Sequence, residues 1–393
     1  MATIIIDDIG PAVTFSLTEG GPGSSMMKRL HLVHPELGTG SVRTALYLAA
    51  LTWVPLFILC LVEGLAFGGV KVPFFYDIGA HARFLLAVPI LVLADIPIGT
   101  RLRQAVTHFI AAHLVREDEK AKFGDALLDA LRLRDSHLAE LTVLVLAYVA
   151  TYNAIEDSIQ GDSWYRLGPG HELTFVGYWY AIVSLPIFQF LIFRWIYRMI
   201  VWSSFLWRIS KLDLLLTPTH PDAAGGLAFL GKGLVPFGVV LFALSSVVSG
   251  AIATRILFTG GKLEEYQWSY VALFVVGLVV FAGPLLIFVP KLLALKQRGL
   301  LEYGILGSEY TQAFHQKWVQ SMTPTEVLLG SGDIQSLADL GNSFEIIQKM
   351  RILPVQPTDF IAMVLPGLIP ALPLAATVMP VGDILSRLLK LVL

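Results

Sequence analysis

The chain has 393 residues, of which 55% are hydrophobic and 15% are charged, and its mean hydropathy is +0.69. Soluble domains carry about 25% charged residues, so this composition excludes a soluble protein and indicates an integral membrane protein. The net charge of −2 excludes a global attraction to nucleic acid. The single cysteine, Cys60, excludes an internal disulfide and any CxxC motif, and its apolar surroundings predict a buried hydrophobe.

The N-terminal segment, residues 1–42, carries Asp7 and Asp8 and lacks both a basic start and an early apolar core. These features are not those of a cleavable signal peptide, so the first membrane span is expected to direct insertion.

Seven apolar stretches predict membrane-spanning helices, because about 20 apolar residues cross the hydrocarbon core. Two of the stretches are short and become spans only if their polar residues face inward. The predicted spans are 44–66, 82–100, 139–158, 176–205, 232–256, 267–290 and 359–380. The predicted fold class is therefore all-α: a polytopic helical membrane protein with a six-span core over residues 43–290.

The chain after the sixth span predicts two further parts. Residues 291–358 are expected to form a small helical cytoplasmic insert, because 333–351 has apolar residues at helical spacing after a Gly-Ser-Gly turn. Residues 359–393 begin with the last span, which is expected to be broken because each proline in it removes a backbone donor. These prolines are Pro366, Pro370, Pro373 and Pro380. The tail that follows predicts an amphipathic helix along the membrane interface.

Lysine and arginine gather in alternate connections between the predicted spans. The connection 101–138 holds seven basic residues, whereas the next connection holds only Arg166. Basic residues return after the fourth and sixth spans. Because basic connections stay on the cytoplasmic side, this alternation predicts a cytoplasmic N-terminus.

Three stretches resemble those of uncharacterised bacterial multi-pass inner-membrane proteins. They are DIGAHARFLLAVPILVLAD (77–95), LTPTHPDAAGGLAFL (216–230) and the 333–351 helix, and the proline-rich end is similar to the same group. The resemblance implies a location in the bacterial inner membrane and supplies no activity.

One group of polar residues is predicted to gather near the outer ends of several spans. An ionised group within a span costs about 2.5–3.5 kcal/mol, so such groups usually face a partner or a cavity. A polar vestibule for a small anionic solute is one reading, and local pairing or snorkelling at the interface is the other. The candidate substrate-binding residues are Glu63, Asp77, His81, Arg83, Tyr152, Glu156 and Arg255.

A second candidate is the LTPTHPDAAGG loop. His220 and Asp222 could form an acid–base pair or contribute to a metal site, and they are the only candidates for catalysis. The alternative is a stiff turn in which Asp222 caps a helix that starts near Ala223. One histidine and one aspartate are too few for a metal site, so no metal is predicted.

Arg194 and Arg198 lie one turn apart in the inner half of the fourth span. They could bind an anionic substrate or a lipid headgroup. They could equally reach to the headgroups or pair with a carboxylate such as Asp95.

The absence of phosphate-loop, GxSxG and mid-span histidine patterns predicts no nucleotide, serine-hydrolase or haem chemistry, and no cofactor is expected. The leading prediction is a transporter or channel-like protein that binds a small polar or anionic solute between helices. The alternatives are a membrane-embedded enzyme at His220 and Asp222, and a membrane scaffold or sensor acting through 291–358. The expected partners are the lipid bilayer and, through 291–358, a cytosolic protein; homo-oligomer formation stays open.

Overall fold

The computed structural model describes Ser16 and residues 39–156, 162–168, 172–320 and 332–375. Seven helices in this part of the chain are long and apolar enough to cross a membrane, which confirms the predicted class and span number. The predicted amphipathic tail after Pro380 lies outside the described residues, as does nearly all of the N-terminal segment.

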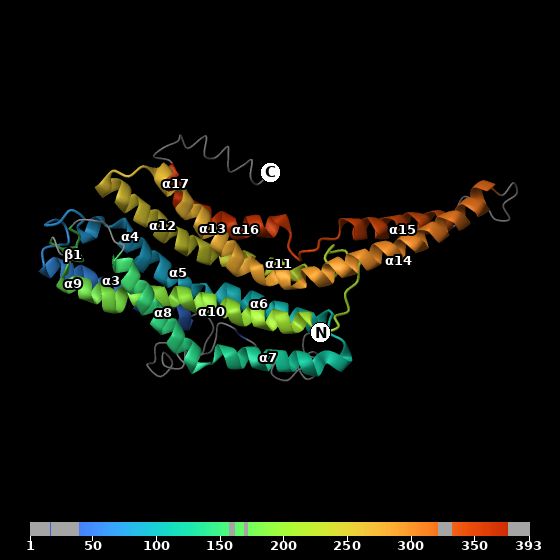
Figure 1. Cartoon of the computed structure of the whole chain (residues 1–393), viewed down its shortest axis with the longest axis horizontal. Coiled ribbons are helices and arrows are strands. Elements are labelled where there is room, and N and C mark those ends of the chain that lie inside the picture. Colours follow the sequence, from blue (N-terminus) through green and yellow to red (C-terminus); the bar gives the residue numbers. More distant parts are fainter. Residues whose placement is uncertain (1–15, 17–38, 157–161, 169–171, 321–331, 376–393) are drawn as a thin grey trace.

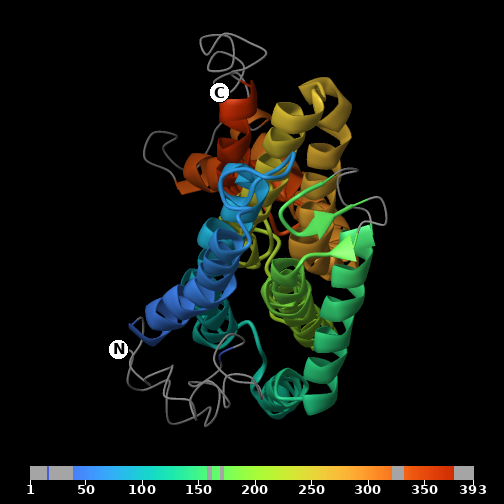
Figure 2. The ribbon, with the colours of Figure 1, turned by 90° about the vertical axis from the view of Figure 1, so that its left-hand side faces the viewer.

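The helices run roughly parallel to the long axis of the molecule (Figure 1). Two two-residue strands form a small hairpin at one end, which we call the strand end; Figure 2 looks at the bundle from this end. The first four spans and their connections contain α3 (Thr39–Val62), η2 (Phe74–Tyr76), α4 (Ile78–His81), η3 (Ala82–Ala87), α5 (Val88–Leu93), α6 (Asp95–Ala111), η4 (Glu117–Glu119), α7 (Lys120–Arg134), α8 (His137–Glu156), β1 (Arg166–Leu167), β2 (Glu172–Leu173), α9 (Phe175–Trp179), η5 (Tyr180–Ser184) and α10 (Leu185–Ser210).

The second half of the chain supplies three spans and a helical hairpin. Its elements are α11 (Phe229–Lys232), η6 (Val235–Phe237), α12 (Gly238–Thr259), η7 (Leu263–Tyr266), α13 (Gln267–Ala282), η8 (Gly283–Phe288), α14 (Val289–His315), η9 (Gln316–Gln320), α15 (Gly332–Lys349), α16 (Pro357–Leu368), η10 (Ile369–Ala371) and α17 (Leu372–Ala375). The last span is thus divided into short segments around Pro370, in line with its proline content.

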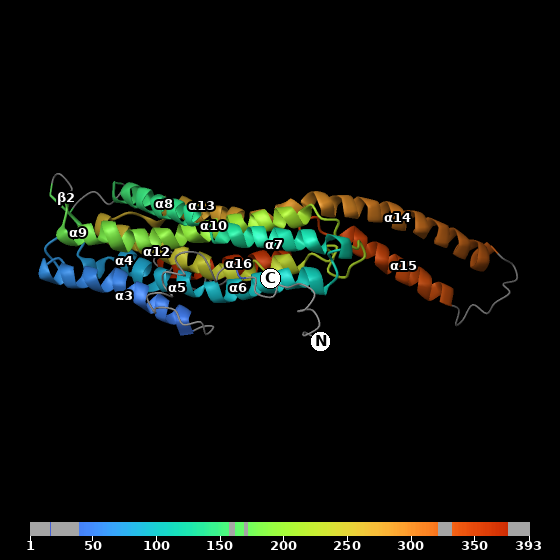
Figure 3. The ribbon, with the colours of Figure 1, turned by 90° about the horizontal axis from the view of Figure 1, so that it is seen from below.

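The predicted insert forms a helical hairpin, in which α14 and α15 lie side by side and extend beyond the bundle (Figures 1 and 3). We call this the hairpin end of the molecule. Gly299 of α14 packs against Pro218 at the base of the hairpin. The part of α14 and η9 beyond that contact, residues 300–320, is about 30 Å long at the usual helical rise.

Two spans contain a π-helical turn next to a proline. The turn η3 precedes Pro89 in the second span, and η5 precedes Pro186 in the fourth. A proline inside a helix cannot donate a backbone hydrogen bond, and its ring clashes with the carbonyl four residues earlier. The wider turn relieves that clash, and such turns often occur at functional sites.

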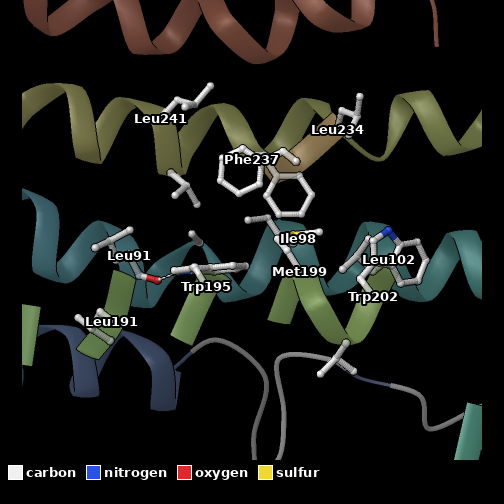
Figure 4. Close-up of a cluster of buried hydrophobic side chains, with 14 of the residues drawn as sticks. Leu91, Ile98, Leu102, Leu191, Trp195, Met199, Trp202, Leu234, Phe237 and Leu241 are labelled. Carbon is white, nitrogen blue, oxygen red and sulfur yellow. Dashed lines mark hydrogen bonds between the residues drawn. The ribbon is translucent and has the colours of Figure 1, made fainter. Parts of the chain in front are cut away.

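The core runs along the whole bundle, and Figure 4 shows its central part. Small residues allow the closest helix contacts, and Gly250 of the fifth span makes one of them. A Cβ at Gly250 would lie 2.9 Å from the Ala82 side chain and from the Ile78 carbonyl oxygen. The second and fifth spans therefore meet almost backbone to backbone.

Candidate functional site

Asp77 organises the strand end of the bundle. Its Oδ1 caps α4 by accepting a hydrogen bond from Ala80 N at 3.1 Å, and its Oδ2 accepts one from Trp164 Nε1 at 2.9 Å. The Thr254 hydroxyl donates to Asp77 Oδ1 at 3.2 Å and accepts from Gly79 N at 3.1 Å. This carboxylate thus joins three separate parts of the chain, and its acceptor sites serve the fold.

His81 is also engaged through both ring nitrogens. Nδ1 accepts a hydrogen bond from Trp53 Nε1 at 2.9 Å, and Nε2 lies 2.9 Å from the Phe75 carbonyl oxygen. An indole can only donate and a carbonyl can only accept, so these two contacts fit the tautomer with its proton on Nε2. In this arrangement it ties the first span to the second rather than offering a free base.

Arg83 differs from these two residues because most of its hydrogen-bonding capacity is unused. The side chain starts from the π-helical turn η3, and Nη1 donates to the Tyr180 hydroxyl, at the start of η5, at 2.8 Å. Nε is buried and has no hydrogen-bond partner among the described residues. The guanidinium carbon lies 5.8 Å and 5.7 Å from the ring centroids of Phe84 and Phe188.

No carboxylate in the described part of the chain forms an ion pair with Arg83. The side chain is half-buried, and two aromatic rings supply weak cation–π attraction in place of a counterion. A guanidinium presents five N–H donors, and the Tyr180 hydroxyl takes only one of them. The site therefore has spare donors and a positive charge within a span that forms no ion pair among the described residues.

A buried tryptophan packs against the tyrosine that binds this arginine. Trp164 is fully buried, and its ring centroid lies 5.1 Å from that of Tyr180 and 5.0 Å from that of Phe74. Its backbone N–H donates to Val72 O at 3.1 Å. The backbone at Val72 and the Tyr180 ring thus hold Trp164 next to the Arg83–Tyr180 pair.

The remaining predicted vestibule residues do not join this group. Arg255 is exposed, and its guanidinium lies 6.0 Å from the ring centroid of Tyr266. Tyr152 is 67% exposed, Glu156 is exposed, and Glu63 is half-buried after α3. Among residues 39–156, 162–168, 172–320 and 332–375, no hydrogen bond or ion pair links these side chains to Arg83.

Arg198, the second arginine of the fourth span, forms a buried ion pair. It donates to both carboxylate oxygens of Asp95, with Nη2 to Oδ2 at 3.0 Å, and only 7% of its side chain is exposed. Arg194 lies one turn away, within electrostatic range of Arg198, Asp95 and Glu140. The contacts of Arg198 therefore favour the pairing alternative over substrate binding, whereas Arg194 forms no ion pair among the described residues.

The LTPTHPDAAGG loop is built around the Asp222 carboxylate. It accepts backbone hydrogen bonds from Ala224 at 2.8 Å, Gly226 at 3.1 Å and Ala228 at 3.0 Å, and it lies 2.9 Å from His220 Nδ1. Partial burial raises the pKa of Asp222, but these hydrogen bonds outweigh burial and hold the pKa below its usual range. The carboxylate is therefore saturated by its own loop.

The capping alternative predicted a helix that starts near Ala223, but this loop does not continue directly into a helix. Ala223, Gly225 and Gly226 have positive φ values of 49°, 66° and 99°, and α11 begins only at Phe229. The left-handed backbone turns successive N–H groups toward one carboxylate. Asp222 thus caps a tight turn rather than a helix.

The same loop connects the bundle to the hairpin. Arg351 donates through its backbone N–H to Ala223 O at 2.8 Å and through Nη2 to Asp222 O at 2.7 Å. Leu215 N donates to Leu114 O at 2.8 Å, which fixes the start of the loop to the end of the second span. The sequence motif thus marks a structural junction.

Sequence analysis missed the residues that surround Arg83, namely Tyr180 and Trp164. Neither residue is among the candidate site residues that the sequence predicts. The available signal was the pair of prolines, Pro89 and Pro186, because each predicts a local distortion of a span.

Comparison with protein families, curated proteins and solved structures finds no match. In the described residues, no group of three or more His, Cys, Asp or Glu side chains could hold a metal ion. Fold and site together define a polytopic α-helical membrane protein with an arginine at the strand end of its bundle that forms no ion pair among the described residues.

Proposed function

We propose that the protein binds a small anion at Arg83 and that this binding serves transport or channel-like passage of the anion. The supporting observation is a half-buried guanidinium that lacks a carboxylate partner in the described structure and has a buried, unpartnered Nε. Leaving a cation unpaired within a span is costly. An anion that accepted hydrogen bonds from the spare N–H groups would remove that cost, as carboxylates and phosphates do elsewhere.

The location of Arg83 also supports the proposal. It lies between two π-helical turns, where the backbone departs from regular helix in two adjacent spans. Tyr180, whose hydroxyl accepts from Arg83, packs against the buried Trp164, so an anion that takes the place of this hydroxyl requires these rings to move. Such a movement fits a protein that admits a solute from one side at a time.

The test is thermal unfolding of the full chain in lipid nanodiscs with a panel of anions: chloride, nitrate, bicarbonate, phosphate and small carboxylates. A ligand at 100 times its dissociation constant stabilises the folded state by about 2.7 kcal/mol. We expect one class of anion to raise the midpoint of wild type and of Arg255→Gln, but not of Arg83→Gln. Arg255 is the matched control, because it is an exposed arginine.

Flux of the stabilising anion into proteoliposomes then tests the transport part of the proposal. Arg83→Gln should abolish flux, and Arg83→Lys should keep part of it, because lysine retains the charge but loses the planar fork. If no anion stabilises wild type, or if Arg83→Gln responds as wild type does, the site assignment is wrong. Binding without flux would refute transport alone.

A second candidate function rests on the hairpin. Leu301 is 65% exposed, Ile305 53%, Val319 63% and Ile334 48%, although this hairpin extends beyond the bundle (Figure 3). Exposed apolar side chains on a projecting helical hairpin favour a platform for a soluble protein. A photo-crosslinking residue at Leu301 should then give a discrete protein adduct in membranes, and one at the exposed polar residue Gln312 should not. Equal labelling at both positions would exclude a defined platform.

A further inference from the structure

An apolar cavity of about 100 Å³ lies between four of the spans. Its lining includes Leu91 from the second span, Trp195 from the fourth, Leu244 from the fifth, and Val276 and Phe281 from the sixth. An engineered cavity of about 150 Å³ with a similar lining stays free of water and binds benzene. The cavity therefore has room for a few carbon atoms of an apolar ligand.

The lining residues divide into a buried floor and an exposed rim. Leu91 is 1% exposed, Trp195 4% and Phe281 5%, and all three lie at the floor. Val276 is 58% exposed and stands at the rim. The cavity thus opens onto the surface of the sixth span, beside the fourth.

The depth of the cavity matches the interior of a bilayer. Its lining residues on the sixth span, 273–281, lie about 9–21 Å along the helix from Gln267, in a hydrocarbon core about 30 Å thick. The surface around the opening therefore faces acyl chains rather than headgroups or water.

The chemistry of the lining excludes polar ligands. The one side-chain N–H at the floor, Trp195 Nε1, already donates to Leu91 O at 3.0 Å, as Figure 4 shows. A water molecule needs two to four polar partners, about three in most buried sites, and this cavity offers it none. The other lining residues are aliphatic, apart from Phe281 and Gly277.

We propose that this cavity binds the terminal part of a membrane lipid's acyl chain, which enters past Val276. Acyl chains are the most abundant apolar groups of a bilayer at this depth. The inserted carbons contact Trp195, and the guanidinium carbon of Arg198 lies 4.8 Å from the centre of that ring. The chain is thereby adjacent to the side chains that hold the Arg198–Asp95 ion pair. This inference does not depend on anion binding at Arg83.

The test uses a phosphatidylcholine that carries a diazirine near the methyl end of one acyl chain, in nanodiscs with the full-length protein. After illumination, mass spectrometry of the digest locates the adducts. Floor residues are nearly inaccessible from the surface, so only a chain inside the cavity labels them. We expect adducts on Leu91 or Trp195 in wild type.

Two valines of the sixth span provide matched variants. Val276 lines the cavity, whereas Val279 is 64% exposed and does not. Val276→Trp should close the rim and reduce floor adducts about tenfold, equivalent to 1.4 kcal/mol, whereas Val279→Trp should leave them unchanged. Leu244→Phe, which fills the cavity from the fifth span, is the second variant and should give the same loss.

Two results would overturn the proposal. The first is a floor that stays unlabelled while exposed valines of the sixth span are labelled, which would mean that acyl chains do not enter or that another part of the chain fills the space. The second is an equal loss of floor adducts in Val276→Trp and Val279→Trp. Thermal unfolding of each variant shows whether a loss of label comes from misfolding. If Val276→Trp misfolds, Leu244→Phe takes its place as the variant that closes the cavity.

Discussion

Replacing Asp222 with alanine tests whether one carboxylate holds the junction between bundle and hairpin. The substitution removes the acceptor of three backbone hydrogen bonds, those from Ala224, Gly226 and Ala228. Only 18% of the Asp222 side chain is exposed, so water replaces these bonds incompletely. At about 1 kcal/mol of net free energy for each bond, the loop loses about 3 kcal/mol.

The asparagine variant sharpens this prediction. Oδ1 accepts from Ala224 and Gly226, and Oδ2 accepts from Ala228. Asparagine retains one carbonyl oxygen and places an NH₂ group where the other oxygen was. Two bonds survive with the oxygen in the Oδ1 position, and the third becomes a contact between two donors. Asp222→Asn should therefore destabilise the loop by less than Asp222→Ala.

Hydrogen exchange measures both effects directly. A loss of about 3 kcal/mol raises the local opening equilibrium about 100-fold, so the protection of amides 224, 226 and 228 should fall by that factor in Asp222→Ala. The amide of Arg351 should lose protection too, because it donates to Ala223 O in the same loop. Unchanged protection at these amides, or a larger loss in Asp222→Asn than in Asp222→Ala, would refute the role assigned to the carboxylate.

Four further predictions follow from the same structure. Because the pKa of Asp222 is lowered in the folded state, its contribution to stability is complete above the ordinary carboxyl pKa of about 3.9 and is lost as the pH falls through the folded pKa. Protection factors of the loop amides should therefore decrease in wild type when the pH is lowered beyond about 4, and they should stay constant in Asp222→Ala. Asp95→Asn should lower the unfolding midpoint more than Arg198→Met, because it leaves the nearly buried Arg198 without the carboxylate that accepts both of its hydrogen bonds, whereas Arg198→Met leaves Asp95 within electrostatic range of Arg194; equal losses would contradict this. Gly250→Val should destabilise the contact between spans two and five, since its Cβ would lie 2.9 Å from the Ile78 carbonyl oxygen, and a midpoint like that of wild type would refute this close contact. Gly124→Ala should stabilise the chain by about 0.5–1 kcal/mol, because Gly124 is inside α7 with nothing within 4 Å of an added Cβ, and a lower midpoint would show that this space is not free.

The spans could be predicted from the sequence because crossing a membrane imposes a length and a composition on each helix. All seven predicted spans overlap the helices found. The lengths differ, because the second span continues through α6 to Ala111 and the fourth continues through α10 to Ser210, past the ends that the sequence predicts. Hydropathy alone does not reveal such extensions, since a helix continues wherever other helices cover it.

The candidate residues were identified by type but not by role, because a role depends on partners far away in the sequence. Asp77 accepts from Trp164 and Thr254, which come 87 and 177 residues later. The sequence shows a carboxylate near a span end, and it does not show whether those acceptor sites are free. For Asp222 the partners are local, and even there the predicted helix start was wrong, because the chain adopts positive φ at Ala223 instead.

Spans two and four together carry the three features that bear on function. Arg83 of the second span and Tyr180 of the fourth form the hydrogen-bonded pair at the strand end. Leu91 and Trp195 both line the cavity. Asp95 and Arg198 form the ion pair. Arg83 and Asp95 are about 18 Å apart along a helix, and the lining residues of the cavity lie between them. Movement of one span against the other would therefore alter all three features together. If an anion at Arg83 draws the two π-helical turns closer, the acyl-chain cavity between the same helices changes shape. Anion binding should then change lipid labelling of the cavity floor in wild type and leave this labelling unchanged in Arg83→Gln. Equal labelling with and without the anion would show that the two sites act independently.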